Sequence, residues 1–324
     1  LALESFEPYR TPDFERSGLL RLDINERPDG APAYVIDALR EALQPQQVAT
    51  YPNYDEWMKH ASRSFGVDRA LILPTNGADE GIRAIIDAHQ MPGTALVTHA
   101  PGFDMFALAA RLHANPVVEV SFDVTGPARF EFADEPWFAA LEASDPAPGV
   151  VAIATPNNPT GAIVPRSAIE RTLAAVTCPV IVDETYGAFA GETCVDLVPA
   201  HPHLFVLRSF SKVHGLAGLR IGAVISQPQN ISGLRRLLNP YNVNCAAVAA
   251  SIACMKRPDD IAKHITEVLA TRASFVDALR RMRFDVGVEN ANFVLVHVGE
   301  DHALLTAALR KQDVLIRDRH GSHP

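Results

Sequence analysis

A lysine flanked by hydroxyl side chains and followed by glycines and an arginine lies in residues 208–222, which read RSFSKVHGLAGLRIG. A lysine attacks a carbonyl to form a Schiff base only when its amine is near neutral, and a nearby cation such as Arg220 favours that state. The hydroxyls of Ser209 and Ser211 and the Arg220 guanidinium are groups that bind phosphate. The stretch alone is also compatible with a surface turn, so a Lys212 that holds a phosphorylated aldehyde is a hypothesis that depends on the neighbouring motifs.

A carboxylate and a tyrosine follow a β-rich run at residues 179–186, which read PVIVDETY. The apolar residues are typical of a buried strand that ends at Asp183. Open α/β sheets bind ligands at the carboxyl ends of their strands, where a carboxylate can keep a pyridine nitrogen protonated so that the ring withdraws electrons. Tyr186 can donate to a ring phenolate. Taken singly, Asp183 is also compatible with a helix cap and Tyr186 with a core tyrosine.

An asparagine- and proline-rich turn ends a second buried run, at residues 150–161 (VVAIATPNNPTG). Pro159 biases Asn158 toward extended backbone, and an amide held there can donate to a ring oxygen, although the same residues are also good turn formers. Further upstream, Asn76 precedes a helical pattern with Ile82 and Ile86 on one face. The first amides of such a helix are free to bind an anion, so the sequence predicts a phosphate seat there.

These stretches share one interpretation, a site for pyridoxal phosphate, and they resemble the fold-type I pyridoxal-phosphate enzymes. The nearest resemblance is to the histidinol-phosphate aminotransferase family, and it extends over nearly the whole chain. The motifs that carry it are residues 22–28 (LDINERP), 51–54 (YPNY), 77–80 (GADE), 101–103 (PGF), 156–161 (PNNPTG), 183–186 (DETY) and 209–222 (SFSKVHGLAGLRIG).

The resemblance implies a role for each matching residue. Lys212 is similar to the Schiff-base lysine, Asp183 to the partner of the pyridine nitrogen and Tyr186 to a partner of the ring oxygen, and these three form the implied catalytic set. The residues implied to contact the cofactor are Tyr51, Ala78, Asp79, Phe103, Asn158, Asp183, Tyr186, Ser209, Ser211, Lys212 and Arg220. The residues implied to contact the substrate are Tyr9, Asn25 and Arg317. No metal ligand is implied.

Tyr51 resembles a tyrosine that reaches the phosphate from the other subunit, so the resemblance also implies a homodimer. The chain departs from the family pattern at His214 and at residues 26–30 (ERPDG). A further departure follows Arg317, where the family continues to a strand whose arginine binds the substrate carboxylate. That arginine is expected beyond Pro324. Either the sequence is trimmed, which its start at Leu1 without a methionine favours, or carboxylate binding works differently.

Composition excludes several other classes of protein. The 324 residues are 48% hydrophobic and 21% charged, enough for a large core. A net charge of −9 and a pI near 5.7 argue against a nucleic-acid partner. The apolar stretch at 245–255 is too short to span a membrane, and the twelve histidines lack metal-site spacing. Scattered cysteines suit a reducing cytoplasm; they are Cys178, Cys194, Cys245 and Cys254.

Alternating strand and helix patterns predict an α/β fold, with a mostly parallel sheet covered by helices and a smaller α/β C-terminal domain. The resemblance implies that this fold is of the fold-type I class. Strands are expected at 95–98, 150–154, 180–183, 204–207, 221–225 and 293–298. Helices are expected at 33–43, 259–282 and 301–311, with an alanine-rich helix after Asn244. The predicted division is an arm and part of the small domain at 1–48, a large cofactor domain at 49–244 and a small domain at 245–324.

The predicted function is amino transfer between an amine, by resemblance histidinol phosphate, and a 2-oxo acid such as 2-oxoglutarate, with pyridoxal 5′-phosphate as cofactor. Two alternatives stay open. A threonine-phosphate decarboxylase resembles the same family and differs only in which α-carbon bond is held perpendicular to the ring. A non-catalytic regulator that binds the cofactor is the more distant alternative, because a fold alone does not prove function.

Overall fold

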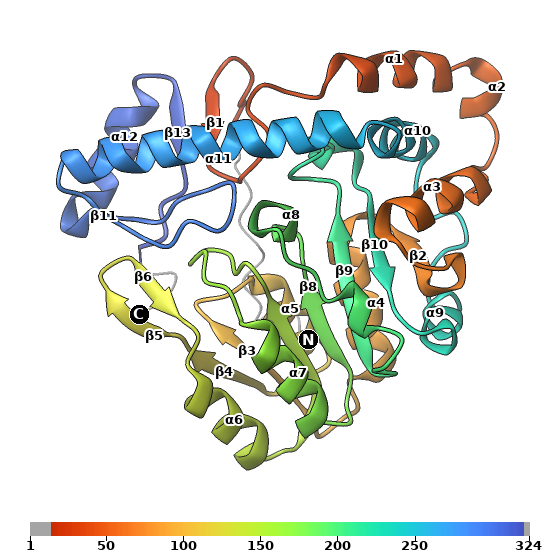
Figure 1. Ribbon diagram of the computed structural model, residues 1–324, viewed down its shortest axis with the longest axis horizontal. Coiled ribbons are helices and arrows are strands. Elements are labelled where there is room, and N and C mark those ends of the chain that lie inside the picture. Colours follow the sequence, from red (N-terminus) through yellow and green to blue (C-terminus); the bar gives the residue numbers. More distant parts are fainter. Residues whose placement is uncertain (1–13, 321–324) are drawn as a thin grey trace.

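A seven-stranded sheet forms the centre of the computed structural model, which describes residues 14–320 (Figure 1). Five neighbouring strands, β9, β8, β7, β3 and β4, are parallel, and β10 lies antiparallel between β2 and β9. In spatial order the strands are β2 (Ile72–Thr75), β10 (Gly222–Ile225), β9 (Leu204–Ser209), β8 (Val180–Asp183), β7 (Pro148–Ala154), β3 (Ala95–Ala100) and β4 (Val117–Ser121).

The central strands are apolar on both faces because helices cover both faces of the sheet. On one face, Leu96, Ala152 and Phe205 pack against α4 (Gly77–His89), α5 (Asp104–Leu112) and α9 (Pro228–Leu234). On the other face, Val97, Ile153 and Val182 pack against α6 (Asp134–Ala143) and α7 (Arg166–Ala175). This two-sided burial explains the continuous Val, Ile and Ala runs and confirms the predicted α/β fold class.

A third hydrophobic cluster covers the β2–β10 end of the sheet. Trp57 lies at its centre, fully buried, and donates a hydrogen bond of 2.9 Å to Ser251 Oγ. The helices that build it are α1 (Ala33–Ala42), α3 (Asp55–Phe65) and α10 (Cys245–Met255), with α2 (Pro45–Val48) between α1 and α3 along the chain. Phe210 and Ile221, which bracket the turn that carries Lys212, belong to the same cluster, so this packing fixes both ends of that turn.

The long helix α11 (Pro258–Arg281) runs across the upper part of Figure 1 and packs against α10 and α8 (Gly187–Ala190); of the remaining elements, the hairpin β5–β6 lies away from it, near β4. The parallel pair β1–β13 brings the N-terminal segment beside the C-terminal one. The elements are β1 (Leu20–Leu22), β5 (Asp123–Gly126), β6 (Arg129–Glu131), β11 (Asp285–Val286), β12 (Val296–His297), α12 (His302–Arg310) and β13 (Val314–Ile316).

One predicted strand is wrong. Residues 293–298 were expected to be extended, but only Val296–His297 form a strand, paired with β11. The residues before it bend instead, because Asn292 donates to the Asn25 carbonyl and Phe293 packs against Tyr186. The predicted domain division at 48/49 and 244/245 stays a prediction. Within residues 14–320, no helix is long and apolar enough to cross a membrane.

A buried histidine on β3 leads to a testable expectation about stability. His99 is stacked between Phe122 and Trp137, with ring centroids 4.6 and 4.1 Å away, and neither ring nitrogen has a hydrogen-bond partner among the described residues. Burial lowers the pKa of His99 from 6.5 to about 3, so the folded protein keeps the ring neutral. The unfolded chain takes up a proton near pH 6.5 and the folded one does not, so stability falls as the pH drops from 6.5 toward 3.

We expect His99→Leu to reduce this loss of stability in acid by about 1.4 kcal/mol for each pH unit between 6 and 4. Urea unfolding at several pH values measures it. The exposed His297 supplies the control, since His297→Leu should leave the pH dependence as it is in the parent protein. Equal pH slopes for His99→Leu and the parent protein would contradict the account.

Candidate active site

Four neighbouring parallel strands end at the same edge of the sheet and carry the predicted site residues there. Strand β9 ends at Ser209, β8 at Asp183, and β7 leads into the turn with Asn158, while the loop after β3 presents Phe103. The register aligns Ala154 with Asp183 and Asp183 with Leu207, so these ends are level. The fold therefore brings together residues that are more than one hundred positions apart, at the place where open α/β sheets bind ligands.

Lys212 is the only one of the chain's five lysines that is not exposed; the others are Lys59, Lys256, Lys263 and Lys311. Its Nζ donates to the carbonyl of Ile24 at 2.9 Å and lies 5.7 Å from the centre of the Tyr186 ring. A half-buried amine beside a backbone carbonyl and an aromatic ring is in the partly desolvated setting that a Schiff-base lysine requires.

Asp183 is buried at the end of β8, and its carboxylate has one oxygen engaged. Oδ1 accepts from the Thr185 amide at 2.9 Å and from the Thr185 hydroxyl at 2.6 Å. Among the described residues Oδ2 has no hydrogen-bond partner, so it is the oxygen available to a ring nitrogen. Burial, together with the charges of Asp79 and Glu184, raises the pKa of Asp183 to about 6, against the opposing effect of the hydrogen bonds from Thr185. A positively charged pyridine ring next to Asp183 would offset the cost of burying the charged carboxylate.

Tyr186 is buried beside Asp183 and is held by two segments from elsewhere in the chain. Its hydroxyl oxygen accepts from Asn25 Nδ2 at 3.0 Å, and its ring meets Phe293 edge to face with centroids 5.1 Å apart. Burial raises the pKa of the phenol well above its usual value of 10. The phenol therefore stays protonated throughout the physiological range.

Groups suited to a phosphate cradle meet where helix α4 begins. The helix has no side-chain cap at its N-terminus, and the Arg220 guanidinium approaches it, donating to Asp79 Oδ2 at 2.7 Å. Arg220 also reaches Ser211 Oγ at 3.5 Å, and the Ser211 amide donates to Ser209 Oγ at 3.2 Å. Uncapped helix amides, two hydroxyls and a guanidinium together suit a phosphate.

Glycines keep this cradle open. A Cβ on Gly77, whose φ is +79°, would lie 2.6 Å from Arg220 Nη2, and one on Gly222 would lie 2.9 Å from the Ala78 nitrogen. A larger residue at Gly77 would push Arg220 away from the start of α4, and one at Gly222 would push the start of α4 away from β10. The residues present therefore fit the phosphate of pyridoxal phosphate, and Asp183 fits its pyridine nitrogen.

The aromatic and amide residues that we predicted around the ring also lie at this edge. Phe103 directly precedes α5 and packs edge to face on Phe106, with centroids 5.9 Å apart. Asn157 ties this loop to the next one by donating to the Pro101 carbonyl at 2.9 Å. Asn158 beside it is half-buried and makes no side-chain hydrogen bond within residues 14–320, so its amide is available to a ligand.

Two further predicted residues are exposed. Tyr51 is 74% exposed and stacks on Tyr241 with centroids 4.2 Å apart. Arg317 follows β13 and is exposed. Tyr9 lies outside the described residues. Their implied roles stay predictions.

Several residues at the site were not predicted. Thr185 holds the Asp183 carboxylate, the Ile24 carbonyl holds Lys212, and Asn292 and Phe293 reach Asn25 and Tyr186. Thr185 could have been inferred from its spacing of two residues after a strand-terminal aspartate, where side chains often hydrogen-bond locally. The other contacts join residues that are between 107 and 267 positions apart, and no local pattern signals them.

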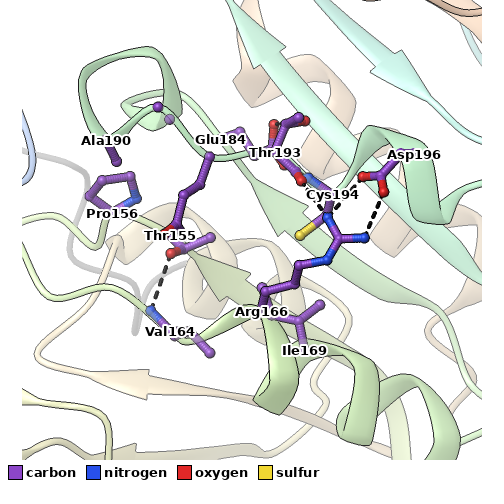
Figure 2. A pocket seen from close by; sticks show the side chains of 13 residues that line it. Thr155, Pro156, Val164, Arg166, Ile169, Glu184, Ala190, Thr193, Cys194 and Asp196 are labelled. Atoms are coloured by element: carbon purple, nitrogen blue, oxygen red, sulfur yellow. Dashed lines mark hydrogen bonds and ion pairs between the residues drawn. The ribbon is translucent and has the colours of Figure 1, made fainter.

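A separate pocket of about 360 Å³ opens behind the ends of β7 and β8 (Figure 2). Three of its four charged lining residues are already paired: Arg166 binds Asp196 at 2.6 Å, and Glu184 binds Arg208 at 3.1 Å. Among the described residues, its lining includes none of the predicted site residues. Within residues 14–320, there is no group of three or more His, Cys, Asp or Glu side chains that could hold a metal ion.

Comparison with known proteins assigns the family. Residues 17–323 match the family Aminotransferase class I and II, and the chain belongs to it. This membership confirms the predictions of an aminotransferase of the fold-type I class and of pyridoxal 5′-phosphate as its cofactor. A histidinol-phosphate aminotransferase of Desulfitobacterium hafniense is 34% identical over 298 residues, which cover 90% of this chain and 80% of the relative.

Two solved structures share the fold. The histidinol-phosphate aminotransferase of Sinorhizobium meliloti, in complex with pyridoxal-5′-phosphate, has a TM-score of 0.82 at 24% identity and covers 92% of this chain and 82% of its own. L-threonine-O-3-phosphate decarboxylase of Porphyromonas gingivalis has a TM-score of 0.76 at 22% identity, with 93% and 89% covered. Both likenesses concern the fold alone.

Proposed function

We propose that this protein transfers the amino group of histidinol phosphate to 2-oxoglutarate, as a step of histidine biosynthesis. The observation that carries the proposal is the convergence of Lys212, Asp183, Tyr186 and Arg220 at one sheet edge in a chain whose 34% identical relative is a histidinol-phosphate aminotransferase. The decarboxylase shares only the fold with this chain, at 22% identity, so it is the weaker candidate.

Each residue has a definite task in this proposal. Arg220, Ser209, Ser211 and the amides of Ala78 and Asp79 hold the cofactor phosphate, and Phe103 covers a ring face. When bound, pyridoxal phosphate supplies an electrophilic carbon and a ring that withdraws electrons.

The remaining tasks concern protons and orientation. Lys212 holds the cofactor at rest and then takes a proton from the substrate α-carbon as general base. Asp183 keeps the ring nitrogen protonated, and Tyr186 and Asn158 bind the ring oxygen. Arg317 faces the anionic end of the substrate.

The test is to titrate the purified protein, loaded with pyridoxal phosphate, with L-histidinol phosphate and then with 2-oxoglutarate. The proposal predicts that L-histidinol phosphate abolishes the visible absorbance of the bound cofactor and that 2-oxoglutarate restores it. The amount of glutamate formed should equal the amount of cofactor restored. O-phosphothreonine should release no carbon dioxide. Carbon dioxide release without amino transfer would favour the decarboxylase, and a band that histidinol phosphate leaves unchanged would contradict the proposed substrate.

The proposal includes a homodimer in the cytoplasm. Large apolar side chains are exposed close together in sequence around the Tyr51–Tyr241 stack, which is a surface that a second copy could cover. They are Leu43, Val48, Tyr51, Leu237 and Tyr241. All four cysteines are free, in keeping with a reducing compartment.

Tyr51 gives the dimer proposal a test. If it reaches the phosphate of the partner's site, Tyr51→Phe should weaken cofactor binding about tenfold, the cost of one hydrogen bond to a charged group. Fluorescence titration of the dimer with pyridoxal phosphate measures this. Tyr241→Phe is the matched control, because it removes the hydroxyl of the stacked partner ring. Equal affinities for Tyr51→Phe and the parent protein would contradict the cross-subunit role.

A further inference from the structure

Asn25 connects the catalytic lysine and tyrosine through one short stretch of backbone. Its Nδ2 donates to Tyr186 Oη at 3.0 Å, and the carbonyl of the preceding residue, Ile24, accepts from Lys212 Nζ at 2.9 Å. Asn25 has a φ of 55°, in the left-handed region, which asparagine tolerates better than almost any other residue with a side chain. The sequence thus places at this position a residue that supplies both the turn and an amide donor.

A second asparagine holds this stretch in place. Asn292 donates from Nδ2 to the Asn25 carbonyl at 3.2 Å, and the next residue, Phe293, packs against the Tyr186 ring. The Asn292 Oδ1 is buried with no partner among the described residues. Residues 292–293 therefore touch both members of the Asn25–Tyr186 pair.

The direction of the Asn25 hydrogen bond determines where the tyrosine proton points. A phenol has one proton to donate and lone pairs with which to accept. Because the Asn25 amide fills one acceptor position on Tyr186 Oη, the phenol proton must be directed to a different partner. Asp183 and Lys212 are the charged groups nearest to Tyr186. The Asp183 carboxylate accepts hydrogen bonds from Thr185, and the Lys212 amine donates one to the Ile24 carbonyl.

We propose that Asn25 is a positioning residue, which aims the Tyr186 proton at the phenolic oxygen of bound pyridoxal phosphate, and that Asn292 holds Asn25 in the conformation required. This inference rests on the proposed function. The predicted contact of Asn25 with the substrate stays a prediction beside it. A donor held on the ring oxygen stabilises its anionic form, so it lowers the pH at which the bound cofactor changes its absorbance.

The test is a pH titration of the visible absorbance of the bound cofactor, in the absence of any substrate. Asn25→Gly keeps the left-handed backbone and removes only the amide. We expect the midpoint of the titration to rise by about half a pH unit in Asn25→Gly and by about one unit in Tyr186→Phe, as expected for loss of a hydrogen bond.

A double-mutant cycle separates positioning from a direct effect. Since Asn25 acts through the Tyr186 hydroxyl, Asn25→Gly in the Tyr186→Phe background should shift the midpoint no further. Additive shifts would overturn the inference while leaving the proposed function standing. A protein that shows no visible band with pyridoxal phosphate would overturn the proposed function, and the inference with it.

Asn292 offers a second variant, at a residue that is not proposed to contact the cofactor. Asn292→Asp keeps the size of the side chain but removes the donor to Asn25, so it should raise the midpoint by less than Asn25→Gly does. Asn290→Asp is the matched control, because Asn290 donates at 3.0 Å to the Gly161 carbonyl and not to Asn25. Equal shifts in the two variants would contradict the role of Asn292.

Discussion

Lys212→Ala should lower amino transfer by about 10⁴-fold, because it removes both the covalent anchor of the cofactor and the general base. The visible absorbance that the protein shows with pyridoxal phosphate should also disappear, since none of the other four lysines lies at the site. Phosphate binding should persist, as Arg220, Ser211 and the first turn of α4 remain. Steady-state rates and absorbance spectra measure the two losses.

Lys263→Ala is the control for this experiment. Lys263 is exposed on α11, where its one ion pair, with Glu267, is 3.8 Å long. This variant should keep the parent spectrum and rate. If Lys212→Ala kept both as well, Lys212 would not be the residue that holds the cofactor.

Asp183→Asn should lower the rate by about 10³-fold, because an amide cannot stabilise a protonated ring nitrogen. The same substitution should have the opposite effect on the stability of the protein without cofactor. Burial raises the pKa of Asp183 from 3.8 to about 6, so the folded state binds this proton more tightly than the unfolded chain. The group is most favourable to folding below pH 4, and that advantage is lost as the pH rises through 6.

At pH 7 the buried carboxylate is charged, and its neutral replacement should stabilise the cofactor-free protein by on the order of 2 kcal/mol. Urea unfolding at pH 7 and pH 4 measures the gain, which should shrink at pH 4. Asp277→Asn, on an exposed position of α11, should change neither rate nor stability. Lower stability of cofactor-free Asp183→Asn at pH 7 would contradict the account, because it would mean that the carboxylate is paired within the protein.

Five of the seven strands of the central sheet could be predicted because each leaves a local pattern, whereas β2 and β4 were not among the expected strands. Strands 150–154, 180–183 and 204–207 were expected within two residues of their observed bounds, since burial on both faces requires continuous apolar runs. The strand expected at 293–298 failed for a physical reason. Its apolar residues are used in contacts with Tyr186 and the N-terminal segment, and only Val296–His297 pair with a neighbour.

The site was predictable where a strand end supplies the residue, as for Asp183, Asn158 and Ser209. These positions follow buried runs, and parallel strands bring them to one edge. The contacts of Asn25 and Asn292 could not be predicted in the same way. They join the chain across 161 and 267 residues, and an asparagine in a turn shows no sign in the sequence of which distant group its amide will meet.

The most direct test of the central claim is to reduce the protein loaded with pyridoxal phosphate with borohydride, digest it and locate the modified lysine by mass spectrometry. The account predicts one label per chain, on the peptide that contains Lys212. The absence of a label, or a label on Lys59, Lys256, Lys263 or Lys311, would contradict it.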